Sequence, residues 1–77
     1  IRVNSICPGV MATPPILRMY EELGDDAPVA PIVERTVDGR PGDPRAVAWA
    51  GLYLASDEAA WVTGANIVVD GGAGAYM

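Results

Sequence analysis

The residue types that do most enzyme chemistry are scarce in this sequence. Its 77 residues include no histidine, one cysteine (Cys7) and five basic residues, all of them arginine. Histidine is the commonest transition-metal ligand and a frequent general base, and one cysteine can form neither an internal disulfide nor a multi-cysteine metal site. The composition therefore predicts that the chain binds no metal ion.

Polar residues gather at a few places along the chain. Four carboxylates lie around Gly24: Glu21, Glu22, Asp25 and Asp26. They could form acid and base pairs, but beside a glycine that ends a helix we interpret them as a solvated acidic face. We interpret Cys7 as a small buried hydrophobe rather than a reactive thiol. Asn4 is interpreted as structural, tying a strand end to its neighbours through side-chain hydrogen bonds.

Charge and hydropathy exclude several classes of partner. The formal net charge of -5 argues against nucleic acid and against an anionic membrane surface, because both attract basic patches. No apolar run approaches the roughly 20 residues of a membrane span, so we expect an acidic cytoplasmic protein. Because 51% of so short a chain is hydrophobic, we also expect faces that pack against something else.

The first half of the chain is predicted to hold a strand, a turn and a short helix. Alternating residues over 1–7 indicate a strand, which the breaker pair Pro8-Gly9 closes. A helix is expected over about 15–23, because four apolar residues share one helical face: Ile16, Met19, Tyr20 and Leu23. They either line a substrate pocket or pack the helix on the domain. Residues 25–42 are rich in proline and glycine, so they are expected to be irregular or broken into short helical turns.

The second half is predicted to hold a longer helix and a second strand. Asp43 offers an N-cap and Pro44 a first helical position. The helix that follows has two apolar stripes, which consist of Val47, Ala50, Gly51 and Leu54 on one side and Ala48, Leu52 and Ala55 on the other. A helix that is apolar on two sides is normally covered on both. The β-branched run at 65–69 indicates a strand, which Asp70-Gly71-Gly72 ends.

These elements predict an α/β fold. Two strands joined by a helical crossover are expected to be parallel neighbours, and a parallel sheet is covered on both faces. Two strands alone are too few for a stable sheet. The chain is therefore expected to form one edge of a larger parallel-sheet domain, with helices between its two strands.

Four short sequences carry a family likeness: IRVNSICPGVMAT at 1–13, GRPGDP at 39–44, LASDEA at 54–59 and VTGANIVVDGG at 62–72. In this order and spacing they resemble the classical short-chain dehydrogenase/reductases over nearly the whole chain. Residues 14–38 depart from the pattern, at the place of that family's variable substrate-binding loop. The resemblance implies that residues 1–77 are the C-terminal segment of one NAD(P)-binding, doubly wound Rossmann-type domain, with a lid at about 14–42.

The resemblance also implies a role for the residues after the first strand. Pro8 and Gly9 would shape the turn beside the nicotinamide of NAD or NADP, although they could be only a strand exit. Met11 would offer backbone groups to the nicotinamide carboxamide, and Thr13 its hydroxyl and backbone. A carboxamide has a donor and an acceptor that such groups satisfy in a fixed geometry.

The family's catalysis needs a serine and a Tyr-x-x-x-Lys pair, and this sequence has no lysine. Tyr20, Tyr53 and Tyr76 therefore cannot be that tyrosine, and we expect no catalytic residue in the chain. The resemblance implies an intact oxidoreductase that transfers hydride between the cofactor and a secondary alcohol or ketone. The 77-residue chain alone would be inactive and would supply nicotinamide contacts, the lid and an oligomer interface.

The resemblance implies a homo-oligomer, a dimer or tetramer, formed through the 43–55 helix and the 65–70 strand. Trp49 and Trp61 either anchor such an interface or pack within the chain. Two other interpretations stay open: a non-catalytic interaction module, and an inactive relative that binds the cofactor without turnover.

Overall fold

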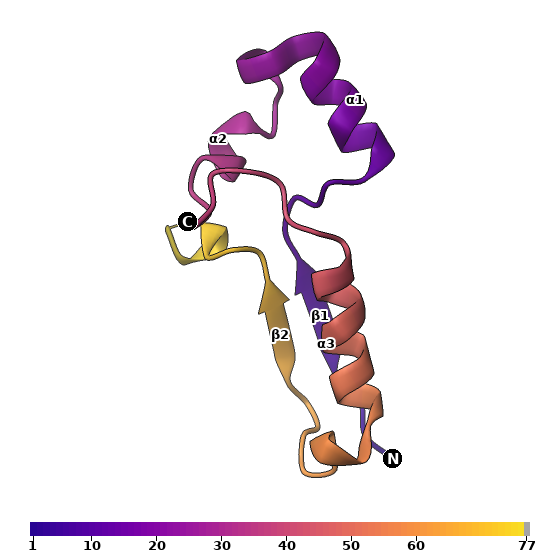
Figure 1. Cartoon of the computed structure of the whole chain (residues 1–77). Helices are drawn as coiled ribbons and strands as arrows, with labels where there is room; N and C mark the ends of the chain where they lie inside the picture. Colours follow the sequence, from indigo (N-terminus) through magenta and orange to yellow (C-terminus); the bar gives the residue numbers. More distant parts are fainter. Residues whose placement is uncertain (77) are drawn as a thin grey trace.

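The computed structural model describes residues 1–76 and shows two parallel strands beside one long helix, with a helical excursion at one end (Figure 1). The elements are β1 (Ser5–Pro8), α1 (Pro14–Leu23), α2 (Ala30–Val33), α3 (Arg45–Ala55) and β2 (Asn66–Val69). Short 3-10 turns occupy Gly24–Asp26, Asp57–Ala59 and Ala73–Tyr76. The α/β prediction is confirmed.

The two strands pair in parallel, as predicted. Ser5 lies opposite Asn66, and the ladder runs to the pair of Pro8 with Val69. The first strand was expected over 1–7, and its start was placed too early. Val3 bonds instead to residues 63 and 64, and the left-handed φ of 73° at Gly64 turns the partner chain just before the ladder begins.

Two polar side chains close the amino end of the sheet. The Asn4 amide donates to the carbonyl of Val62 at 3.0 Å, and its oxygen accepts from the backbone N–H of Ala65 at 2.9 Å. The Arg2 guanidinium donates to the carbonyls of Val62 and Leu54, at 3.2 and 3.0 Å. Arg2 thereby satisfies a carbonyl near the end of α3, which has no partner within the helix. The structural interpretation of Asn4 is confirmed.

Helix α3 covers one face of the sheet. Ile6 on β1 lies against it, with its Cδ1 3.7 Å from the place that a Cβ on Gly51 would take. The stripe that contains Gly51 is half-buried, whereas Leu52 on the opposite stripe is 69% exposed. Among residues 1–76, therefore, α3 has a cover on one of its two apolar sides.

The other face of the sheet is open. Cys7 and Val68 are partners in the ladder, and both are exposed, Val68 to 61%. The interpretation of Cys7 as buried was wrong for this chain. Side chains alternate between the faces of a strand, so α3 covers the face of Ile6 and leaves the face of Cys7 to solvent.

The excursion of residues 14–42 leaves the carboxyl end of β1 and returns beside it. Its two short helical segments agree with the expectations for 15–23 and 25–42. On α1 the predicted face is half-buried at Ile16, Met19 and Tyr20, while Leu23 is 48% exposed. On return, Gly42 forms a parallel bridge with Met11. The excursion is therefore tied at both ends to one turn.

The chain is extended and thinly packed. Its buried hydrophobic residues, among those described, are all small: Ala27, Ala30, Val33, Ala59 and Ala73. The accessible surface is 5560 Å², whereas a compact monomer of 8.0 kDa exposes roughly 4,450 Å². The radius of gyration is 14.4 Å against roughly 11.5 Å for a compact domain of this length. Much apolar surface thus remains without a covering layer.

None of the helices that the structure describes has the length and apolarity that a membrane crossing requires.

Candidate functional site

The four residues expected to contact a cofactor lie in one turn at the carboxyl end of β1. Pro8 ends the strand, and the next backbone N–H, that of Gly9, donates to the carbonyl of Val69 at 2.9 Å. Thr13 precedes α1, and its carbonyl accepts the N–H of Leu17 at 2.9 Å. In parallel α/β sheets, ligands bind outside the carboxyl ends of the strands. Residues 8–13 stand at that edge; because the sequence predicts a cofactor contact there, they are called the cofactor turn below.

Position 9 must be a glycine, because the backbone there lies very close to the chain after β2. A Cβ at this position would lie 2.7 Å from the Cβ and 2.8 Å from the Cα of Asp70. Atoms cannot approach so closely without displacement of one backbone, so glycine at this position is explained by packing. Asp70 was not singled out from the sequence. The signal was present, because carboxyl ends of adjacent parallel strands meet at the same edge.

The backbone groups of Met11 and of its two neighbours point to opposite sides of the extended turn. The carbonyl of Val10 and the N–H of Ala12 bond to Gly42, at 2.9 and 2.7 Å. The N–H of Met11 therefore points to the opposite edge, where no acceptor exists within residues 1–76. Its carbonyl accepts the N–H of Thr13 at 2.8 Å. Met11 thus presents a free donor on the side away from the excursion.

Thr13 carries a second free polar group. Although it stands at the start of α1, its hydroxyl makes no cap hydrogen bond. Within the described residues the hydroxyl has no other partner, and the side chain is partly exposed. The turn therefore combines the Met11 N–H donor with a hydroxyl that can both donate and accept.

A hollow of about 270 Å³ lies on the other side of the turn, between the strand ends, the start of α3 and the end of the excursion. Its lining includes Met11, Thr36, Arg40, Asp43, Val69 and Asp70. The sequence placed Thr36 and Arg40 only within the broad lid region of about 14–42, because their segment has no periodicity. Only the return of the excursion to Met11 brings them to the strand ends.

One carboxylate in this hollow is held by an arginine. The side chain and backbone N–H of Arg45 donate hydrogen bonds to Asp43, the side-chain contacts measuring 2.6 to 3.2 Å, and they hold the pKa of Asp43 below its ordinary value of 3.8. The same contacts raise the pKa of Arg45. Helix α3 is assigned from Arg45 rather than Pro44, but the 2.9 Å bond from the Arg45 N–H to Asp43 provides the expected cap.

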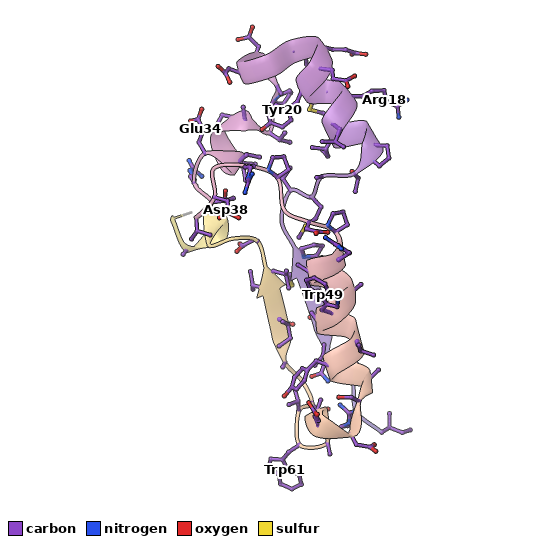
Figure 2. The ribbon with its side chains drawn as sticks, in the orientation of Figure 1. Arg18, Tyr20, Glu34, Asp38, Trp49 and Trp61 are labelled. Atoms are coloured by element: carbon purple, nitrogen blue, oxygen red, sulfur yellow. The ribbon has the colours of Figure 1, made fainter. Side chains whose placement is uncertain are left out.

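Other chemistry-bearing side chains lie away from the turn. Glu21, Glu22, Asp25 and Asp26 are exposed, as expected of a solvated acidic face. Within residues 1–76, no three His, Cys, Asp or Glu side chains lie close enough together to hold a metal ion. Figure 2 shows Trp61 at the end of the molecule opposite α1, far from the cofactor turn.

The chain matches known proteins over nearly its whole length. Residues 1–74 match the family described as enoyl-(acyl carrier protein) reductase. The chain is 40% identical over 74 residues to an NADP-dependent (R)-specific alcohol dehydrogenase of Lentilactobacillus kefiri, covering 94% of this chain and 27% of that protein. It also superposes on a protein from Burkholderia xenovorans described as a short-chain dehydrogenase/reductase, with a TM-score of 0.75 and 44% identity over 96% of this chain and 29% of that one.

The chain belongs to the short-chain dehydrogenase/reductase family. A further solved member, a mutant 4-hydroxyisoleucine dehydrogenase complexed with NADH and succinate, matches with a TM-score of 0.72 and 36% identity, covering 97% of this chain and 30% of that one. The Rossmann-type fold class is thereby confirmed. The chain spans 25% to 30% of the length of the curated relatives it matches.

The packing of Gly9 against Asp70 predicts opposite effects for two glycine substitutions. Gly9→Ala places a methyl group 2.7 Å from Asp70 and should lower the free energy of unfolding by roughly 1–3 kcal/mol, as overpacking does. Gly51→Ala, in α3, meets only Ile6 at 3.7 Å and gains helix propensity, so it should be neutral or stabilising by up to about 1 kcal/mol. Denaturant unfolding of the intact protein measures both. Equal stability of the two variants would contradict the packing argument.

Proposed function

We propose that this chain is the C-terminal part of an NAD(P)-dependent oxidoreductase that transfers hydride between a nicotinamide cofactor and a secondary alcohol or ketone. The observation that carries the proposal is the pair of unpartnered polar groups, the Met11 N–H and the Thr13 hydroxyl, at the carboxyl edge of a parallel sheet. The likeness to an alcohol dehydrogenase and to a dehydrogenase complexed with NADH supports it.

The open edge and the open face of the sheet support the view that the domain continues beyond these residues. Ser5 and Gly9 direct their backbone N–H groups to the β2 side, so Ile6 between them directs its groups to the opposite edge. Such an unpaired edge is a template for another strand. The exposed pair of Cys7 and Val68 leaves a face that a further layer of helices would cover.

The free groups of the cofactor turn fit a nicotinamide carboxamide. The Met11 N–H can donate to the carboxamide oxygen, and the Thr13 hydroxyl can accept from the carboxamide nitrogen. Two such bonds fix the rotation of the ring and so select the face that reacts. The bound nicotinamide supplies the hydride chemistry, and residues 8–13 orient it. Because the sequence has no lysine, the proton-transferring residues of the family belong to other parts of the intact protein.

The excursion of residues 14–42 is proposed as the substrate lid. Its two ends are joined by the bridge of Met11 with Gly42, so both ends are anchored beside the cofactor turn. The hydroxyl of Tyr20 is buried and has no hydrogen-bond partner within the described residues. Figure 2 shows Tyr20 on the side of α1 that faces α2. An apolar face with one unsatisfied hydroxyl suits an alcohol or carbonyl substrate.

The outer side of α3, together with the 65–70 strand, is proposed as a homo-oligomer interface that forms a dimer or tetramer. Large apolar side chains lie exposed there: Trp49 to 60%, Leu52 to 69% and Tyr53 to 44%. The guanidinium of Arg45 lies over the Trp49 ring, 5.7 Å from its centroid, as a cation–π contact does. Contiguous exposed apolar patches of this kind mark association surfaces.

Cofactor binding is the first test. The intact protein should quench or shift the fluorescence of NADH or NADPH on binding, and should oxidise a secondary alcohol in the presence of NAD or NADP. The isolated 77-residue chain should show no turnover. An intact protein that binds the cofactor without turnover would favour the inactive relative. One that binds neither cofactor would overturn the proposal and leave the interaction module.

The Thr13 hydroxyl can be tested separately, because it caps nothing. Thr13→Val should raise the dissociation constant of the preferred cofactor roughly fivefold to tenfold, the equivalent of one lost hydrogen bond. Thr13→Ser keeps the hydroxyl and should stay within about twofold of the unchanged protein. Fluorescence titration gives both constants, and thermal unfolding shows whether stability has changed. If valine and serine bind the cofactor equally, Thr13 has no contact with it.

The interface can be tested with a charge on α3. Leu52→Glu should weaken self-association of the intact protein roughly tenfold or more, because a carboxylate would be buried between apolar surfaces. Leu23→Glu places the same charge at the end of α1, where 48% of the side chain is exposed, and should leave assembly unchanged. Light scattering over a concentration series compares the two. Equal masses for both variants would rule out this face.

A further inference from the structure

The turn that follows β2 touches two parts of the molecule at once. On one side, the backbone of Asp70 lies very close to Gly9: a Cβ added to Gly9 would lie 2.8 Å from the Cα of Asp70. On the other side, the carbonyl of Gly71 accepts the N–H of Val37 at 3.0 Å. A Cβ on Gly71 would lie 3.0 Å from the Cβ of Thr36. Consecutive residues thus contact the cofactor turn and the end of the excursion.

This connecting turn is held rigid from within. One oxygen of the Asp70 carboxylate accepts the N–H of Gly72 at 2.8 Å, and the other accepts the N–H of Gly74 at 2.9 Å. Gly71 and Gly72 both have left-handed φ angles, of 65° and 86°. A side chain that satisfies two backbone donors leaves the turn little freedom, so a displacement of Asp70 moves Gly71 with it.

The excursion is equally stiff where the turn contacts it. The Thr36 hydroxyl donates to the carbonyl of Val33 at 2.8 Å and accepts the N–H of Gly39 at 2.9 Å. Val33 is one of the buried residues of α2. Thr36 is therefore joined to the packed part of the excursion. Figure 2 shows Asp38 beside the segment that follows β2, in agreement with the bond between Val37 and Gly71.

We propose that the Asp70–Gly71 turn couples the cofactor turn to the excursion, and that Gly71 is a positioning residue for the substrate lid. The proposal rests on the function proposed above. The close approach of Gly9 to Asp70 and the hydrogen bond between Val37 and Gly71 link the three segments. A cofactor that orders residues 8–13 then orders the far end of the excursion through Gly9, Asp70 and Gly71 in turn. The coupling is reciprocal, as linkage requires.

Two neighbouring glycines provide a matched test. Gly71→Ala and Gly72→Ala both place a side chain at a left-handed φ, so both carry comparable backbone strain. Only the methyl group at Gly71 meets Thr36, whereas a Cβ at Gly72 meets nothing within 4 Å. The difference between the two variants therefore reports the contact with the excursion and not the strain.

The measurement is amide hydrogen exchange of residues 27–37 in the intact protein, with and without saturating NADH or NADPH. In the unchanged protein and in Gly72→Ala, the cofactor should slow exchange in this segment at least about fivefold, the lower end of ordinary coupling. In Gly71→Ala the slowing should fall below about twofold although the cofactor is bound. If Gly71→Ala does not fold, Thr36→Ser replaces it, because serine removes the methyl that faces Gly71 and keeps the hydroxyl. The slowing should then be reduced as well.

The outcomes separate this proposal from the function on which it rests. If Gly71→Ala and Gly72→Ala both bind the cofactor and their amide exchange is slowed equally, the coupling is overturned and the proposed function stands. Cofactor binding without slowing in the unchanged protein would do the same. Failure of the unchanged protein to bind either cofactor would overturn both.

Discussion

The in-register parallel pairing of β1 with β2 is the constraint on which the other features depend. It places Pro8 opposite Val69, so the two strands end at the same level. The contact between Gly9 and Asp70 follows from that alignment, because the cofactor turn and the turn at Asp70 leave the sheet side by side. At the other end Asn4 bonds to residues 62 and 65 and holds the same register. A shift of one residue would reverse the faces of the strands and separate the two turns.

The pairing is stabilised by one helix, which is less than a parallel sheet normally has. Helix α3 covers the face of Ile6, whereas Cys7 and Val68 on the other face are exposed. Among the described residues, the buried hydrophobic side chains are alanines and one valine, and burial of such small groups provides little hydrophobic free energy. Within the described residues, the sheet therefore has a helical cover on one of its two faces.

The candidate site consists mainly of backbone groups, which suits a chain with no histidine and no lysine. A donor at Met11 and a hydroxyl at Thr13 can bind and orient a ligand, but neither is a strong acid or base at neutral pH. The glycines near them act through close approach: Gly9 admits Asp70, and Gly71 admits Thr36. The roles proposed for this segment are therefore orientation and closure, and both would depend on the distances between three segments of backbone.

The sequence by itself determined the local elements and the limits of the chemistry. Periodicity placed α1 and the inner stripe of α3, the β-branched run placed β2, and the missing lysine excluded the family's catalytic pair. The four residues proposed to contact the cofactor lie close together in the chain, so local sequence could place them in one turn. Local pattern shows which faces are apolar but not what covers them, which is why the exposure of Cys7 was missed. Only the tertiary structure decided that Asp70 packs on Gly9 and Gly71 on Thr36, because contacts between residues so far apart in the chain depend on the register of the strands and the return path of the excursion.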